Sequence, residues 1–215
     1  MQKYKFTGET KEVYGRTLHQ IVCVTAFASV AAGEVGGYIE KEVNLSQDGN
    51  AWVSGNAKVS GDAKVFGDAE VFGNAKVSGN AKVCGNAKVF GDANVSGDAK
   101  VFGNAKVFGD AWVFGDAEVC GDAEVFGNAI LRRGSTETAT DYIVIGPQGS
   151  RRSFATLHLP SNTVCTGCFV GNLNEFKKAV YKNHNPDQGR VTFNNQYQRV
   201  IRVFEFLQEQ DKDAQ

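Results

Sequence analysis

The loop Gly149-Ser150-Arg151-Arg152 combines residue types that could bind a phosphate group. A glycine-containing backbone, a hydroxyl and two guanidinium groups can hold a phosphate through charge-assisted hydrogen bonds. A solvated hairpin turn with two charges would have the same sequence, so both interpretations stay open. Ser150, Arg151 and Arg152 are the candidate ligand-binding residues.

Cysteine and histidine side chains offer a second kind of chemistry. Cys165 and Cys168 form a CxxC pair, which is half of a zinc site, and His158 or His184 could complete it. The pair is expected on a strand, where residues three apart point to opposite faces, and this disfavours chelation. We therefore predict no metal, no cofactor and no catalytic residue. The five cysteines are odd in number and scattered, which is typical of reduced thiols.

A long repeat precedes these residues and must position them. Between Gly49 and Arg132 the phrase Gly-(Asn/Asp)-Ala-x-Val-x occurs fourteen times without interruption. Alternation puts alanine and valine on one face and the two variable residues on the other. Glycine and Asn/Asp tolerate the left-handed backbone that a corner needs. A strand and a corner every six residues, three to a coil, predict a triangular prism of between four and five coils.

This pattern resembles hexapeptide-repeat left-handed parallel β-helix proteins, and the left hand is implied by that resemblance. The segment 36–46, with Gly36-Gly37-Tyr38-Ile39-Glu40 and Asn44-Leu45-Ser46, is similar to the opening of "polymer-forming" hexapeptide proteins of phages and prophages. A C-terminal module of some of these proteins resembles the segments 141–147, 149–151, 167–169 and 173–176. The resemblance brings no catalytic residue for that module.

Residues eighteen apart should stack on the outside of the prism. One column then carries four phenylalanines, Phe72, Phe90, Phe108 and Phe126. An apolar stripe on a soluble protein usually marks an interface, although stacked rings that only shield one another would give the same column. Together with Phe114 from a second column, these residues are the predicted oligomer interface. The resembled proteins commonly pack side by side as trimers, so a homotrimer is expected.

Non-repetitive segments flank the repeat. Residues 1–48, with strands at 3–7 and 16–25, are expected to be a β cap that covers the open edge of the helix. Residues 133–140 read as a linker. Residues 141–215 are expected to form a small α+β domain with strands at 142–145, 154–159 and 163–170. One helix should open with a capping box at Asn172 and Glu175, and another should span 195–208.

Composition excludes several function classes. A net charge of -1 argues against a chain built to coat nucleic acid or an anionic membrane. No apolar run is long enough to span a bilayer, and the N-terminus lacks the apolar centre of a signal peptide, so a cytoplasmic protein is expected. Acyltransferases and zinc carbonic anhydrases that share the resembled helix need histidines in the coils. His19, His158 and His184 all lie outside the repeat, so neither activity is expected.

The favoured hypothesis is a non-catalytic, oligomeric binding or scaffold protein of phage or prophage type, acting in the host cytoplasm. The β-helix would be the oligomerisation rod, and the terminal domains would bind a host-defence component or sequester a phosphate-bearing signalling nucleotide. Two alternatives stay open. One is a transferase with its site at a subunit junction or in the C-terminal domain, and the other is a purely structural, polymer-forming element.

Overall fold

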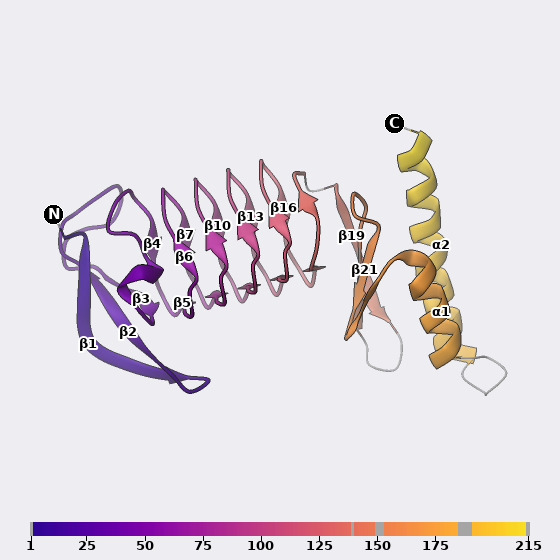
Figure 1. The fold of residues 1–215 in the computed structure, drawn as a ribbon, viewed down its shortest axis with the longest axis horizontal. Coiled ribbons are helices and arrows are strands. Elements are labelled where there is room, and N and C mark those ends of the chain that lie inside the picture. The colour runs from indigo at the N-terminus through magenta and orange to yellow at the C-terminus, as the bar shows by residue number, and fades with distance from the viewer. Residues whose placement is uncertain (1, 139, 149–152, 185–190, 214–215) are drawn as a thin grey trace.

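The chain is mainly β and forms a β-solenoid with different structures at its two ends (Figure 1). The computed structural model describes residues 2–138, 140–148, 153–184 and 191–213. Antiparallel strands lie at the N-terminal end of the rod. A small sheet lies across the other end, with two helices beyond it.

Each hexapeptide of the repeat contributes one strand of two residues. Each strand pairs in parallel with the strand three elements later, as in Lys88 with Lys106 and Val89 with Val107. The partners are eighteen residues apart, which confirms the prediction of three hexapeptides to a coil. The strands are β4 (Trp52–Val53), β5 (Lys58–Val59), β6 (Lys64–Val65), β7 (Glu70–Val71), β8 (Lys76–Val77), β9 (Lys82–Val83), β10 (Lys88–Val89), β11 (Asn94–Val95), β12 (Lys100–Val101), β13 (Lys106–Val107), β14 (Trp112–Val113), β15 (Glu118–Val119), β16 (Glu124–Val125) and β17 (Ile130–Leu131).

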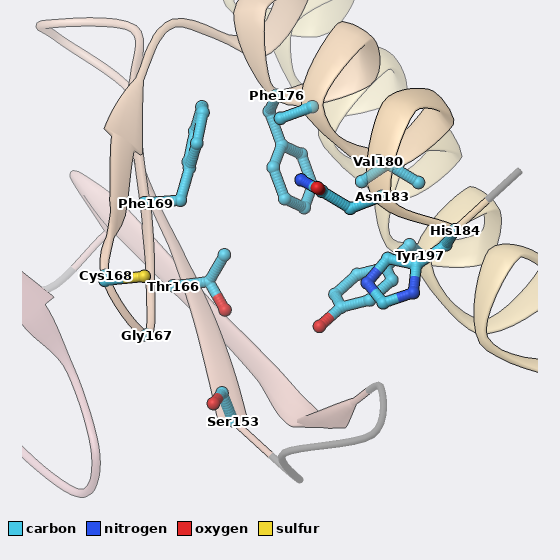
Figure 2. A pocket seen from close by; sticks show the side chains of 11 residues that line it. Ser153, Thr166, Gly167, Cys168, Phe169, Phe176, Val180, Asn183, His184 and Tyr197 are labelled. Atoms are coloured by element: carbon cyan, nitrogen blue, oxygen red, sulfur yellow. The ribbon is translucent and has the colours of Figure 1, made fainter.

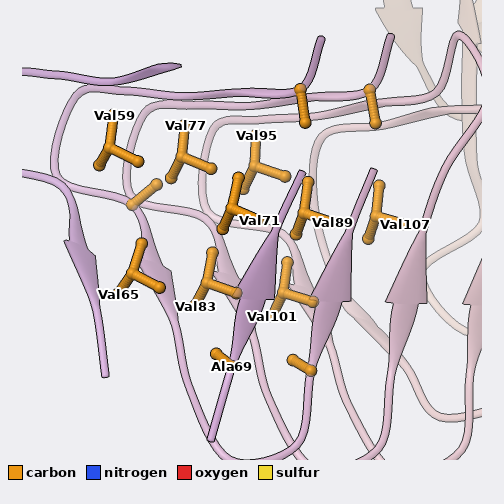
Figure 3. Close-up of a cluster of buried hydrophobic side chains, with 14 of the residues drawn as sticks. Val59, Val65, Ala69, Val71, Val77, Val83, Val89, Val95, Val101 and Val107 are labelled. Carbon is orange, nitrogen blue, oxygen red and sulfur yellow. The ribbon is translucent and has the colours of Figure 1, made fainter. Parts of the chain in front are cut away.

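The interior of the solenoid contains the repeated alanines and valines, as predicted. Every alanine from Ala51 to Ala129 and every valine from Val53 to Val125 is at most 1% exposed (Figure 3). Strand alternation turns these side chains inward, and their small size lets three faces meet around one narrow core. The coils approach closely at the corners, where a Cβ on Gly97 would lie 2.9 Å from the backbone nitrogen of Gly115.

The solenoid is longer than the repeat. One face has six parallel strands, β3 (Val35–Ile39), β5, β8, β11, β14 and β17, and each of the other two faces has five. The expected four to five coils was therefore too low, and about six turns are present. Tyr38 pairs with Lys58 at one end, and β18 (Ser135–Thr136) pairs with β15 at the other. Residues 135–136, which were expected in a linker, are thus part of the solenoid. Backbone hydrogen bonds therefore extend the parallel pairing to residues that do not have the repeat sequence.

The N-terminal segment covers the open end of the first coil. Strands β1 (Tyr4–Val13) and β2 (Arg16–Cys23) are antiparallel, and β2 pairs with β3, so both extend one face of the solenoid. The short 3-10 helix η1 (Glu42–Asn44) follows. Lys3 Nζ donates to the carbonyl of Ala51 at 2.9 Å, and the Asn44 amide donates to the carbonyl of Ala63 at 2.8 Å. These side chains replace the hydrogen bonds that a further coil would make.

The C-terminal segment forms a four-stranded antiparallel sheet with two helices against it. Its strands are β19 (Tyr142–Gln148), β20 (Ser153–His158), β21 (Thr163–Thr166) and β22 (Phe169–Gly171), and its helices are α1 (Leu173–Asn183) and α2 (Val191–Asp213). The strand predicted at 163–170 is two strands, because the chain reverses at Gly167, whose φ of 54° suits a glycine. The last helix is longer than predicted: α2 begins before residue 195 and ends after residue 208.

The predicted capping box at the start of α1 is confirmed. The Asn172 side chain accepts from the Glu175 backbone N–H at 2.9 Å, and the Glu175 carboxylate accepts from the Asn172 N–H at 2.8 Å. In the part of the chain that the structure describes, no helix is long and apolar enough to cross a membrane.

Candidate functional site

A cavity of about 440 Å³ lies in the C-terminal domain, between the β21–β22 turn and the two helices (Figure 2). Its volume falls in the range of small-molecule sites, about 300–1,000 Å³. Strands, turn and helices all contribute side chains: Ser153, Thr166, Gly167, Cys168, Phe169, Phe176, Ala179, Val180, Asn183, His184 and Tyr197.

Four rings form a continuous wall, which we call the aromatic arc: Phe169, Phe176, Tyr197 and His184. Phe169 and Phe176 have centroids 5.4 Å apart, and Phe176 meets Tyr197 edge-on at 5.9 Å. His184 is stacked on Tyr197 at 5.0 Å and 29°. These separations are those of favourable aromatic pairs. The arc is therefore a packed surface that needs little rearrangement to contact a ligand.

Helix packing holds the arc in place. Phe176 and Val180 are one turn apart on α1 and are buried against the sheet, so the helix face next to the cavity is fixed. His184 is the C-cap residue of α1, and the Asn194 amide donates to its carbonyl at 2.9 Å. α2 thus holds the end of α1 beside Tyr197.

Small polar groups form the sheet side of the cavity. Ser153 and Thr166 come from neighbouring strands, and Gly167 and Cys168 form the turn between β21 and β22 (Figure 2). Asn183 faces them from the end of α1. Of the described residues that line the cavity, none is Lys, Arg, Asp or Glu.

The CxxC cysteines have different environments. Cys165 is buried in the sheet, and burial raises the pKa of its thiol to about 11, whereas Cys168 is exposed at the cavity mouth. Within the described residues, no group of three or more His, Cys, Asp and Glu side chains is placed to hold a metal ion.

Ser150, Arg151 and Arg152, the predicted phosphate-binding residues, lie outside the described residues. Ser153, which follows Arg152 in the sequence, lines the cavity. Sequence reasoning missed Thr166 and Asn183 as site residues, and it considered His184 only as a possible zinc ligand. Phe176 and Tyr197 carried a signal, because their helical spacing marks them as inward-facing, but the same spacing is typical of core residues.

A second cavity, of about 400 Å³, lies where the solenoid meets the C-terminal sheet, and Gly134, Ser135, Asp141 and Ser161 are among its lining residues. His158 is buried beside it. The imidazole shares hydrogen bonds with Thr136 of the last coil at 3.0 Å and with Ser161 at 2.6 Å.

The role of His158 is to join the two parts of the molecule. Burial lowers the pKa of its imidazole. A Cβ on Gly134 would lie 2.7 Å from the imidazole Cε1, so the ring is closely enclosed. A serine beside a histidine is one half of a nucleophilic site, but this histidine is held between two structural elements.

Four of the predicted interface residues stack as a ladder along one edge of the solenoid. Phe72, Phe90, Phe108 and Phe126 follow one another with centroid separations of 4.8, 4.9 and 5.3 Å. The predicted column is therefore confirmed. The rings cover one another's faces, and Phe126 at the end is the most exposed, at 47%. Phe114 follows a strand of another face and lies near the Arg132 guanidinium, 5.9 Å from its ring centroid. Their role as an interface stays a prediction.

Comparison with known proteins gives one short similarity. The chain is 40% identical over 50 residues to the uncharacterized acetyltransferase YdcK of Escherichia coli strain K12. The matched part is 23% of this chain and 14% of that protein. No family model matches the chain. The chain is therefore a β-solenoid protein with a short similarity to a protein named as an acetyltransferase.

Proposed function

We propose that the protein is a non-catalytic, oligomeric binding protein whose C-terminal domain holds a small ligand. The observation that carries this proposal is the 440 Å³ cavity with its aromatic arc on one side and neutral polar groups on the other. Such a combination of apolar walls and a few polar groups is typical of ligand sites. The solenoid, a left-handed parallel β-helix of the hexapeptide type, is the rigid rod that carries the site.

The ligand is a phosphate-bearing nucleotide. Ser153 belongs to the cavity wall, and the three residues before it, Ser150, Arg151 and Arg152, have the chemistry of a phosphate-binding loop. Binding without turnover sequesters such a molecule. Similarity to phage and prophage hexapeptide proteins suggests a host-defence signal in the bacterial cytoplasm, which is an argument from association.

Three copies associate through the phenylalanine ladder, with the rods side by side. The ladder is a continuous apolar edge, and a closed ring of three would cover it while repeating the cavity by symmetry. Light scattering on the purified chain measures this directly. A monomer at micromolar concentration would contradict the trimer, and growth without limit would support a structural polymer instead.

Thermal shift against a panel of mono- and dinucleotides tests the ligand. We expect stabilisation by at least one nucleotide, because a ligand that binds only the folded state raises its stability. The shift should disappear in Arg151→Ala/Arg152→Ala. The matched control is Lys64→Ala/Lys82→Ala, which removes two charges of the same sign from exposed positions on the solenoid. No shift with any nucleotide would contradict the proposal.

A transferase is the second candidate, and the similarity to a protein named as an acetyltransferase supports it. The repeat has no histidine, so a base would have to come from elsewhere, and His184, which lines the described part of the cavity, is a candidate. Thermal shift with acetyl coenzyme A, followed by an assay for released coenzyme A thiol in the presence of amine and hydroxyl compounds that can accept the acetyl group, tests this reading. Release that His184→Gln abolishes would favour the enzyme.

A further inference from the structure

We propose that the cavity recognises the planar ring of its ligand, a nucleobase. This inference rests on the proposed function, because it assigns one part of the proposed nucleotide, its base, to the described lining of the cavity. It adds a prediction that a simple phosphate site does not make. The ring, and not the phosphate alone, should be needed for binding.

The charges of the described lining favour a neutral group. None of the described lining residues is an acid, a lysine or an arginine, so this part of the cavity offers no formal counter-ion for a phosphate, apart from a protonated His184. Burying an unpaired charge is costly. An uncharged, flat and polar-edged group is the chemistry that this lining accepts.

The aromatic arc supplies the surface on which a ring can stack. Phe169 comes from the sheet and the other three rings come from the helix side, so the arc runs as one wall from the sheet to the helices (Figure 2). Any of the nucleobases can stack on an aromatic side chain, because every base has a π face. A continuous aromatic wall therefore favours a flat heterocycle over a sugar or an aliphatic chain.

Polar groups lie where the edge of such a ring would reach. Asn183 carries both a donor and an acceptor on one planar amide, which suits the edge of a base. Thr166 supplies a hydroxyl from the sheet, and the Tyr197 hydroxyl is directed toward it from the helix side (Figure 2). Ser153 supplies a second hydroxyl from the sheet side.

Cys168 provides a readout of occupancy. Its thiol is exposed at the cavity, whereas Cys84 is half-buried on the solenoid and serves as an internal reference. The full chain would be treated with iodoacetamide, and alkylation of each cysteine would be followed by mass spectrometry. The probes are inorganic phosphate, ribose 5-phosphate, the four ribonucleosides and their 5′-monophosphates.

We expect at least one nucleoside and its monophosphate to slow alkylation of Cys168 but not of Cys84. Phosphate and ribose 5-phosphate should give no protection. Phe169→Leu should weaken binding by about 5-fold to 150-fold, the loss measured when a stacking ring is removed. Phe66→Leu removes a more exposed ring from another column of the solenoid, away from the phenylalanine ladder, and should leave binding unchanged. Thermal melting of both variants shows that each is folded.

The outcomes separate this inference from the proposed function. If ribose 5-phosphate protects Cys168 as well as the nucleotides do, and Phe169→Leu binds normally, the cavity is a phosphate site and the ring inference is wrong. The proposed nucleotide function would then stand. If no nucleoside or nucleotide gives protection or a thermal shift, both are wrong.

Discussion

Adding one methyl group at a solenoid corner should test how tightly the coils are stacked. Gly97 has a φ of 70° and Gly127 a φ of 63°, so alanine at either position adopts a left-handed backbone at a similar cost of about 1–2 kcal/mol. The surroundings differ. A Cβ on Gly97 would meet the backbone N and O of Gly115 at 2.9 and 3.0 Å, whereas a Cβ on Gly127 would meet nothing within 4 Å.

The steric clash with the next coil is the contribution to stability by which Gly97→Ala and Gly127→Ala differ. Backbone atoms of the next coil cannot rotate away as a side chain can, and overpacking of this kind costs about 1–3 kcal/mol. Gly97→Ala should therefore lower the free energy of unfolding by about 2–5 kcal/mol, and Gly127→Ala by only about 1–2 kcal/mol. The entropy that alanine removes from the unfolded chain is the same in both and cancels in the difference.

Urea unfolding followed by circular dichroism measures this difference. Gly115→Ala is a useful third variant, because Gly115 lies toward the same end of the rod as Gly127, yet its Cβ would meet the Arg132 carbonyl oxygen at 2.6 Å. It should resemble Gly97→Ala. Equal losses in all three variants would refute the argument that coil contact forbids a side chain at these corners.

Three further predictions concern the ends and the surface of the molecule. Burial lowers the pKa of Lys3 from 10.5 to about 8, so the unfolded chain binds more protons between these values. The free energy of unfolding should therefore rise with pH in this window by up to about 3 kcal/mol relative to Lys3→Met, as urea unfolding at several pH values will show. Asn172→Ala breaks the capping box and should destabilise the C-terminal domain in urea by about 1 kcal/mol, which Asn172→Ser should largely avoid. Phe108→Asp should dissociate the proposed trimer in light scattering and keep the fold, whereas Phe102→Asp on another edge should leave it associated.

Each of these results can contradict its premise. A stability difference between Lys3→Met and the parent chain that is constant from pH 8 to 10.5 would mean that Lys3 is not desolvated. An equal loss in both Asn172 variants would place the effect outside the cap. If Phe108→Asp unfolds the chain, the phenylalanine ladder is part of the core and not a surface for association.

The repeat made the solenoid and its outer columns predictable. Spacing alone placed Phe72 and Phe90 in one column, and their rings lie 4.8 Å apart. The prediction failed where the parallel strand pairing continues beyond the hexapeptide repeat. Tyr38 and Ser135 pair with coil strands through backbone atoms, which carry no sequence signal. The cavity was missed for a related reason. Thr166 and His184 are far apart in the sequence and have no periodicity that links them.

The sequence by itself determined the register of the coils, because in a repeat each unit contacts mainly its neighbours and a local rule is applied many times. Tertiary structure alone decided what lies at the ends. Lys3 covers the carbonyl of Ala51, and His158 joins the last coil to the sheet. The aromatic arc exists only because two helices pack against that sheet. Such contacts join segments that each obey a different local pattern, so no single pattern contains them.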